Sequence, residues 1–297
     1  MTAADAGVRR ATLIGGSAVL MWATLALLTT LTGAVPPFQL VAMAFAIAFL
    51  LALGAWLVRG ASVAAHLRQP PAVWALGIAG LFGYHFFYFM ALRNAPAVEA
   101  SLINYLWPLL IVLFSAFLPG ERLRWFHVLG ALAGLAGTVL LLAGSGPAGF
   151  AGEHWLGYLA AFACAFVWSG YSVLSRRFGQ VPTDAVGGFC GATAVLAALC
   201  HVLFEVTVWP AGAEWLAVLA LGLGPVGAAF FVWDHGVKRG DIKALGAFAY
   251  AAPLLSTVLL VAFGQGSATW RIAAACVLIT GGAALAAGDL LRRRRAG

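Results

Sequence analysis

Charged residues are scarce in this sequence, and their scarcity excludes most soluble architectures. Of 297 residues only 9% are Asp, Glu, Lys or Arg, whereas soluble domains carry about 25%. The four cysteines show no metal-ligand spacing, and we interpret them as small apolar packing residues. The connections between apolar segments are too short to hold a water-soluble domain. What is abundant is apolar sequence, at 63% of the chain, which is typical of a protein embedded in a lipid bilayer.

Apolar stretches of about 20 residues, the length of a helix that crosses a bilayer, recur along the whole chain. The first stretch is too long for the core of a signal peptide and lacks a cleavage site, so we interpret it as a transmembrane helix. We therefore predict an all-α membrane protein with ten transmembrane helices. The spans are residues 12–32, 36–58, 72–92, 97–118, 124–143, 154–177, 184–207, 214–237, 243–263 and 269–291.

The basic residues predict how the chain is oriented in the membrane. Connections rich in Lys and Arg stay on the cytoplasmic side of a membrane. With ten spans both termini lie on one side, which holds 15 of the 17 basic residues, while the other side holds only Arg93 and Arg271. The N and C termini are therefore predicted to be cytoplasmic. The net charge of +7 is a topology signal and an attraction to anionic lipid, not a nucleic-acid-binding surface.

The second half of the sequence resembles the first when it is shifted by about 145 residues, so that Pro253 falls on Pro108. We predict two five-helix repeats, residues 1–145 and 146–297. Because each repeat has an odd number of helices, the two must lie inverted in the membrane, around a central cavity. Inverted repeats with interrupted helices are typical of secondary transporters, whose sites lie near the bilayer midplane. Some channels and membrane enzymes are also duplicated.

Aromatic and polar residues lie near the centres of several predicted spans. Seven other tryptophans, Trp56 among them, lie near span ends, where interfacial aromatic belts are expected. A buried phenol or indole needs a hydrogen-bond partner, which in hydrocarbon comes from another helix or a wet cavity. Residues three or four apart, such as Tyr84 and Tyr88, share one helix face. For any single residue, helix packing is a competing interpretation. As a set they predict a substrate cavity lined by Trp22, Tyr84, His85, Tyr88, Ser101, Asn104, Tyr105, Trp107, Trp168, Tyr171, Phe230, Trp233 and Tyr250.

Two prolines and a few ionisable residues complete the candidate set. Pro108 and Pro253 each remove a backbone donor near mid-membrane, which predicts helix kinks that either serve gating or are fixed by packing. Asp234, His235 and Glu99 are candidates for a proton or charge role, because ionisable groups inside spans are costly. None lies at a span centre, which favours facilitated or weakly coupled transport. We find no metal site, no cofactor motif and no sign of an obligate protein partner.

A resemblance to a known family rests on four features. They are "LRNAPA" after the third span, the proline of the fourth span, "GERL" at 120–123, and the Gly-rich fifth span. These features resemble the drug/metabolite transporter superfamily, EamA type, although the second repeat has lost the "GERL" motif. The resemblance implies a ten-helix basket around a central cavity. The aromatic-rich spans are similar to those of superfamily members that export aromatic amino acids across the bacterial inner membrane.

The resemblance and the cavity together predict a secondary transporter, not an enzyme, that exports aromatic or large neutral amino acids by alternating access. Purines, sugars or drugs are alternative substrates. A nucleotide-sugar carrier is disfavoured because no Lys or Arg lies at the midplane to neutralise a diphosphate. A channel is disfavoured because no rings of charges or carbonyls are visible. A membrane-embedded enzyme would need a convergent cluster, and Asp234 with His235 is too small a one.

Overall fold

The structure is a computed structural model that describes residues 3–142, 152–263 and 269–287. Within these residues every regular element is a helix. Within those residues, nine helical segments are long and apolar enough to cross a membrane, and they coincide with the first nine predicted spans. The tenth predicted span overlaps a shorter apolar helix of 17 residues, Trp270–Ala286. The prediction of an all-helical protein with membrane-spanning helices is confirmed.

The helices follow one another in chain order, and several spans are divided into two. The first half of the chain forms α1 (Ala3–Ala23), α2 (Leu25–Thr30), α3 (Pro37–Val58), α4 (Val63–Leu67), α5 (Pro71–Ile78), a π-helical segment (Ala79–Gly83), α6 (Tyr84–Asn94), α7 (Ala97–Asn104), α8 (Trp107–Phe114), a 3₁₀ turn (Ser115–Phe117) and α9 (Trp125–Leu142). The second half forms a 3₁₀ turn (Gly152–His154), α10 (Trp155–Arg177), α11 (Ala185–Phe204), α12 (Glu214–Leu223), a π-helical segment (Gly224–Ala228), α13 (Ala229–Arg239), α14 (Ile242–Phe248), α15 (Ala251–Ala262) and α16 (Trp270–Ala286).

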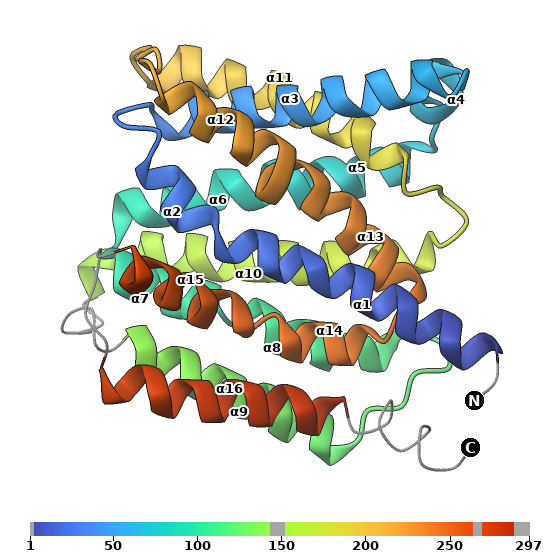
Figure 1. Ribbon diagram of the computed structural model, residues 1–297, viewed down its shortest axis with the longest axis vertical. Helices are drawn as coiled ribbons and strands as arrows, with labels where there is room; N and C mark the ends of the chain where they lie inside the picture. The colour runs from blue at the N-terminus through green and yellow to red at the C-terminus, as the bar shows by residue number, and fades with distance from the viewer. Residues whose placement is uncertain (1–2, 143–151, 264–268, 288–297) are drawn as a thin grey trace.

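The helices cross the molecule from one end to the other (Figure 1). We call the end where α1 begins the N-terminal end; α10, α13 and α16 finish there, on the right of Figure 1. The end where α2 finishes and α3 begins is the opposite end. Pairs of helices from the two halves of the chain pack along each other: α1 with α13, α6 with α10, α3 with α11, and α9 with α16.

Glycine allows the tightest of these helix crossings. A Cβ atom on Gly15 of α1 would lie 2.7 Å from the Cα of Gly236 on α13, and one on Gly130 of α9 would lie 2.5 Å from the carbonyl oxygen of Gly282 on α16. Any side chain at these positions would push the helices apart. Small residues therefore let the backbones touch, as is common between helices in membranes.

Five spans are interrupted near their middle: one between α1 and α2, and four that form two pairs, 145 and 144 residues apart. The π-helical segments begin at Ala79 and Gly224. Helix α7 ends at Asn104 and α8 starts at Trp107; in the same way α14 ends at Phe248 and α15 starts at Ala251. The second pair lies beside Pro108 and Pro253, where the missing N–H prevents a continuous ladder of hydrogen bonds. All four paired interruptions adjoin the cavity described below.

One tryptophan expected in an interfacial belt lies in the core instead. Trp56 is 0% exposed, whereas Trp125 and Trp270 are 69% and 70% exposed, as a belt residue would be. The Trp56 ring stacks on His66 with ring centroids 4.7 Å apart. It fits there because the facing position on α11 is Gly187, where a Cβ would lie 2.7 Å from the indole. Position along the span predicts depth but not which way the ring faces.

Candidate substrate cavity

A cavity of about 620 Å³ lies between the helices, within the range of small-molecule binding sites. Its lining extends from Trp22 and Phe230, near mid-bundle, to Thr29, Pro37 and Arg93 at the opposite end. The last three residues are exposed, so the cavity opens at that end. Toward the N-terminal end the lining stops, among the described residues, at a layer of aromatic rings. In the part of the chain that the structure describes, the cavity is therefore accessible from the opposite end of the bundle.

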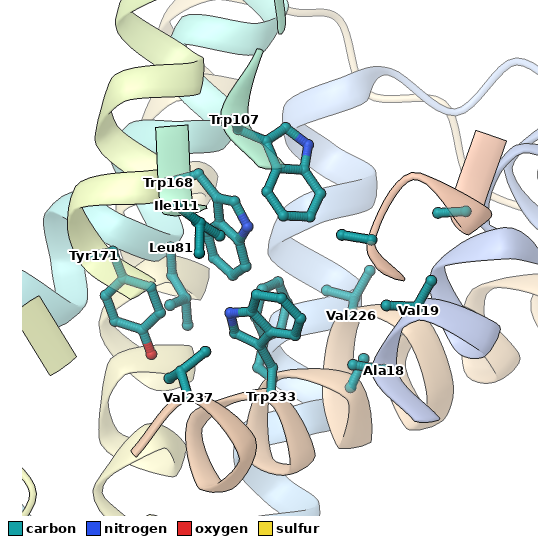
Figure 2. Packing of buried hydrophobic residues seen from close by; sticks show 14 of the residues in the cluster. Ala18, Val19, Leu81, Trp107, Ile111, Trp168, Tyr171, Val226, Trp233 and Val237 are labelled. Carbon is teal, nitrogen blue, oxygen red and sulfur yellow. The ribbon is translucent and has the colours of Figure 1, made fainter. Parts of the chain in front are cut away.

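The inner end of the cavity is formed by four rings, which we call the aromatic floor: Trp22, Trp107, Trp168 and Phe230. Trp22 meets Trp107 and Trp168 edge to face, with ring centroids 6.1 and 5.7 Å apart. Trp168 meets Phe230 in the same way at 5.7 Å. Trp233 packs behind the floor, 5.0 Å from Trp22 between centroids. Figure 2 shows Trp107, Trp168 and Trp233 converging from three helices. Edge-to-face contacts of this kind stabilise a layer of rings beyond their buried area.

The helix interruptions place these rings at one depth. Trp107 is the first residue of α8, and Phe230 is the second residue after the π-helical segment Gly224–Ala228. Interruptions also free backbone carbonyls, which ring nitrogens bind. Trp22 Nε1 donates to the Pro225 carbonyl at 3.1 Å. His85 Nδ1, which must carry the proton in this contact, lies 2.7 Å from the carbonyl oxygen of Leu81. π-Helical segments are frequent at functional sites for this reason.

One wall of the cavity carries polar groups from α6 and α7. The Tyr84 and Tyr88 rings lie nearly parallel, with centroids 6.1 Å apart, on the same face of α6. Asn104 Nδ2 donates to the Tyr84 hydroxyl oxygen at 3.2 Å. Asn104 is only 5% exposed, and its Oδ1 has no hydrogen-bond partner within the described residues. That oxygen is itself buried and does not face the cavity, although Asn104 belongs to the lining.

Ten of the thirteen predicted substrate-binding residues line the cavity, and Tyr171, Trp233 and Tyr250 do not. These three are 2%, 0% and 0% exposed and pack behind the wall. The Trp233 indole donates to Ser172 Oγ at 3.0 Å. The Tyr250 hydroxyl accepts a hydrogen bond from the backbone N–H of Leu109 at 3.2 Å, in the first turn of α8. Tyr250 therefore supplies a partner at the helix interruption of the other half of the chain.

The predicted proton or charge residues do not reach the cavity. Asp234 pairs with Lys238, with 2.9 Å between oxygen and nitrogen, and accepts from the Thr183 hydroxyl at 2.8 Å. Glu99 accepts a hydrogen bond from the Tyr158 hydroxyl, and neither Glu99 nor His235 contributes to the lining. Among the residues described, no group of His, Cys, Asp and Glu side chains could hold a metal ion.

Sequence reasoning missed one charged residue of the lining. Arg93 in the last turn of α6 borders the cavity near its mouth. The lining residues of α6 are Tyr84, His85, Tyr88, Phe89, Leu92 and Arg93. That spacing follows one helix face, so a longer reading of the stripe through Tyr84 and Tyr88 could have found Arg93.

The long apolar helices and the cavity that opens at one end are the features of an α-helical membrane transporter. The chain belongs to the EamA-like transporter family, whose family model matches it twice, over residues 10–143 and 155–288. The predicted resemblance to this family is thereby confirmed.

Individual relatives agree with this assignment. A protein of Ancylobacter novellus named "Aromatic amino acid exporter YddG" is 63% identical over 285 residues, which make up 96% of this chain and 98% of the relative. An Escherichia coli K12 protein of the same name is 25% identical over 212 residues, 66% of this chain and 68% of the relative. A crystal structure at 62% identity matches with a TM-score of 0.89 and covers 93% of this chain and 97% of its own.

Proposed function

We propose that the protein is a secondary transporter that exports aromatic or large neutral amino acids across the bacterial inner membrane by alternating access. The observation that carries the proposal is the aromatic floor: a cavity of about 620 Å³ that ends in three indoles and a phenyl ring. Such a surface stacks favourably on a flat apolar side chain. The polar wall beside it carries the Tyr84, Tyr88 and Ser101 side chains, whose hydroxyl groups suit the polar end of an amino acid. Two relatives named as aromatic amino acid exporters support the same substrate class.

Two inverted five-helix repeats, residues 1–145 and 146–297, form the proposed framework of ten spans. The twofold match to the family model and the pairing of interruptions 145 residues apart support this division. We place both termini in the cytoplasm because 15 of the 17 basic residues then lie on that side. In this orientation the cavity opens away from the cytoplasm, so the structure corresponds to the state from which an exporter releases its substrate.

The proposed transport is facilitated or only weakly coupled to an ion. The described lining of the cavity includes no Asp or Glu. The two candidate carboxylates, Asp234 and Glu99, are buried and are each bound by other side chains. A proton-coupled mechanism normally needs an acid that faces the substrate path. Pro108 and Pro253 lie at the interrupted helices, which we propose as the places where the bundle bends during the cycle.

Exchange assays in liposomes containing the purified full-length protein test this function. Uptake of labelled tryptophan, threonine, a sugar and a purine is compared with and without a pH gradient. We expect tryptophan to exchange fastest and the gradient to change its rate by less than about twofold, because the described lining holds no acid that could couple transport to protons. Faster exchange of the sugar or the purine would contradict the substrate class, and strict dependence on the gradient would contradict weak coupling.

A further inference from the structure

We infer that Arg93 recognises the carboxylate of the substrate and orients it with its side chain toward the aromatic floor. This inference rests on the proposed amino acid transport and deepens it, because it assigns the charged end of the substrate to one residue. It also predicts which analogues the cavity rejects.

Arg93 carries the cavity's formal charge. Among the described lining residues it is the sole Lys, Arg, Asp or Glu. A cavity with one fixed cation and no carboxylate attracts anions and zwitterions and repels organic cations. The planar guanidinium also matches a carboxylate with two parallel hydrogen bonds, which a lysine ammonium cannot offer.

Arg93 forms one long ion pair, with Glu205, which leaves the guanidinium donors available. Glu205 Oε1 lies 3.9 Å from Arg93 Nη2, beyond hydrogen-bond distance. The Glu205 oxygens already accept from the backbone N–H groups of Phe38 and Gln39, at 3.0 and 3.1 Å, and contact His201 Nδ1 at 3.0 Å. The Glu205 side chain is 2% exposed, whereas that of Arg93 is 52% exposed. Glu205 is thus committed to the N-terminus of α3, and Arg93 retains donors that face water.

The geometry of α6 sets Arg93 at a useful distance from the floor. Helix α6 runs from the floor to the mouth of the cavity, and Arg93 follows Tyr84 by nine residues, about 13 Å along the axis. Long helical side chains incline toward the helix N-terminus, which for α6 is the direction of the floor. Tyr84, whose hydroxyl accepts from Asn104, lines the cavity at the inner level. An arginine side chain and the backbone of one amino acid can span the interval between them.

The test uses the full-length protein in liposomes and two analogues of tryptophan. Tryptamine lacks the carboxylate, and indole-3-propionate lacks the ammonium group. We expect indole-3-propionate to inhibit tryptophan exchange more strongly than tryptamine in the unmodified protein. Arg93→Gln should weaken inhibition by indole-3-propionate about tenfold and change that by tryptamine less than about twofold, the size expected for one charge-assisted contact. Arg93→Lys should lie between the two. Arg271→Gln, an arginine predicted on the same side of the membrane and outside the cavity lining, is the control and should retain the original ranking.

Two results would overturn the inference. The Arg93→Gln protein could keep the original ranking of the analogues, or it could lose both inhibitions equally, which would give Arg93 only a structural role at the mouth. Thermal stabilisation of the solubilised protein by indole-3-propionate separates this question from transport. If tryptophan does not exchange but this anion stabilises the protein only when Arg93 is present, amino acid transport is wrong and carboxylate recognition stands.

Discussion

The two ends of the bundle are held in different ways. At the opposite end the cavity is open, and Arg93 forms a long ion pair with Glu205, with 3.9 Å between nitrogen and oxygen. At the N-terminal end Glu121 pairs with Arg176, with 3.0 Å between oxygen and nitrogen, and also with Lys243. Arg176 further donates to the Gly240 carbonyl at 2.8 Å. These contacts join α10 and α14 through the connection between α8 and α9. We call the set Glu121, Arg176 and Lys243 the Glu121 clamp.

This difference indicates which contacts set the equilibrium between the state open at one end and the state open at the other. In the Glu121 clamp the side chains of Glu121 and Arg176 are 16% and 26% exposed, whereas that of Lys243 is buried at 8%. Ion pairs near water contribute little net stability, but a buried cation such as Lys243 is costly when it loses its acid, so the end stays closed while the clamp is intact and opens when water reaches it. A transport cycle needs an end that closes firmly and still opens. We therefore expect the clamp to weigh one state against the other, while the aromatic floor decides what is carried.

The largest effect is expected from the floor, which divides the two ends. Trp168→Ala removes the ring that contacts both Trp22 and Phe230. Loss of a large buried ring costs about 3 kcal/mol, and if this is lost from substrate stacking, exchange falls about a hundredfold. Turnover of tryptophan per folded molecule is the measurement. Trp155→Ala on the same helix is the control, because Trp155 is 62% exposed and should be replaceable. Equal losses in both variants would show that the floor has no special role.

The next largest effect is expected from breaking the Glu121 clamp at the N-terminal end. Glu121→Gln leaves Arg176 and Lys243 without their acid, which should favour the state open at that end by about 1–2 kcal/mol, a factor of about 5–30. A cysteine at Ser175, buried one residue before Arg176, reports this opening through its labelling rate with a polar maleimide. Glu153→Gln, at an exposed acid of the other end, is the control. Unchanged labelling of the Ser175→Cys protein would refute the role of the clamp.

A smaller effect separates a residue behind the floor from one in the open wall. Tyr250→Phe leaves the Leu109 N–H without its partner, which should cost about 1 kcal/mol and lower the melting temperature by a few degrees. The substrate ranking should stay the same, because Tyr250 does not line the cavity. Tyr88→Phe should do the reverse, with altered affinity for tryptophan and an unchanged melting temperature. The comparison fails if both variants change the same quantity.

The smallest effect is expected at Asn104. Asn104→Ala removes one neutral hydrogen-bonding group, worth about 1 kcal/mol, so the half-saturation concentration of tryptophan should rise about fivefold. If Asn104 accepts from the ammonium group, inhibition by tryptamine weakens equally, and inhibition by indole-3-propionate does not. Loss of indole-3-propionate binding alone would instead place the carboxylate at Asn104.

Most of the candidate site is visible in the sequence, because an aromatic or amide group in mid-span is costly and therefore informative. Tyr171, Trp233 and Tyr250, which lie behind the cavity wall, show the limit of this reasoning. Trp233 follows Phe230 by three residues on the same face of α13, yet only Phe230 reaches the cavity. The floor rings cover Trp233, and no pattern within α13 reveals that cover. Arg93 was missed because an arginine at the end of a span is common and therefore does not by itself indicate a functional site.

The sequence by itself determined the spans, their predicted orientation and the interruptions beside Pro108 and Pro253, because hydrophobic length, loop charge and a missing N–H act locally along the chain. Only the tertiary structure decided which end is open. That outcome depends on contacts between distant residues, such as Tyr250 with Leu109 and Glu121 with Arg176. Each of these contacts contributes little free energy, so a cavity that opens at either end remains compatible with one set of helices.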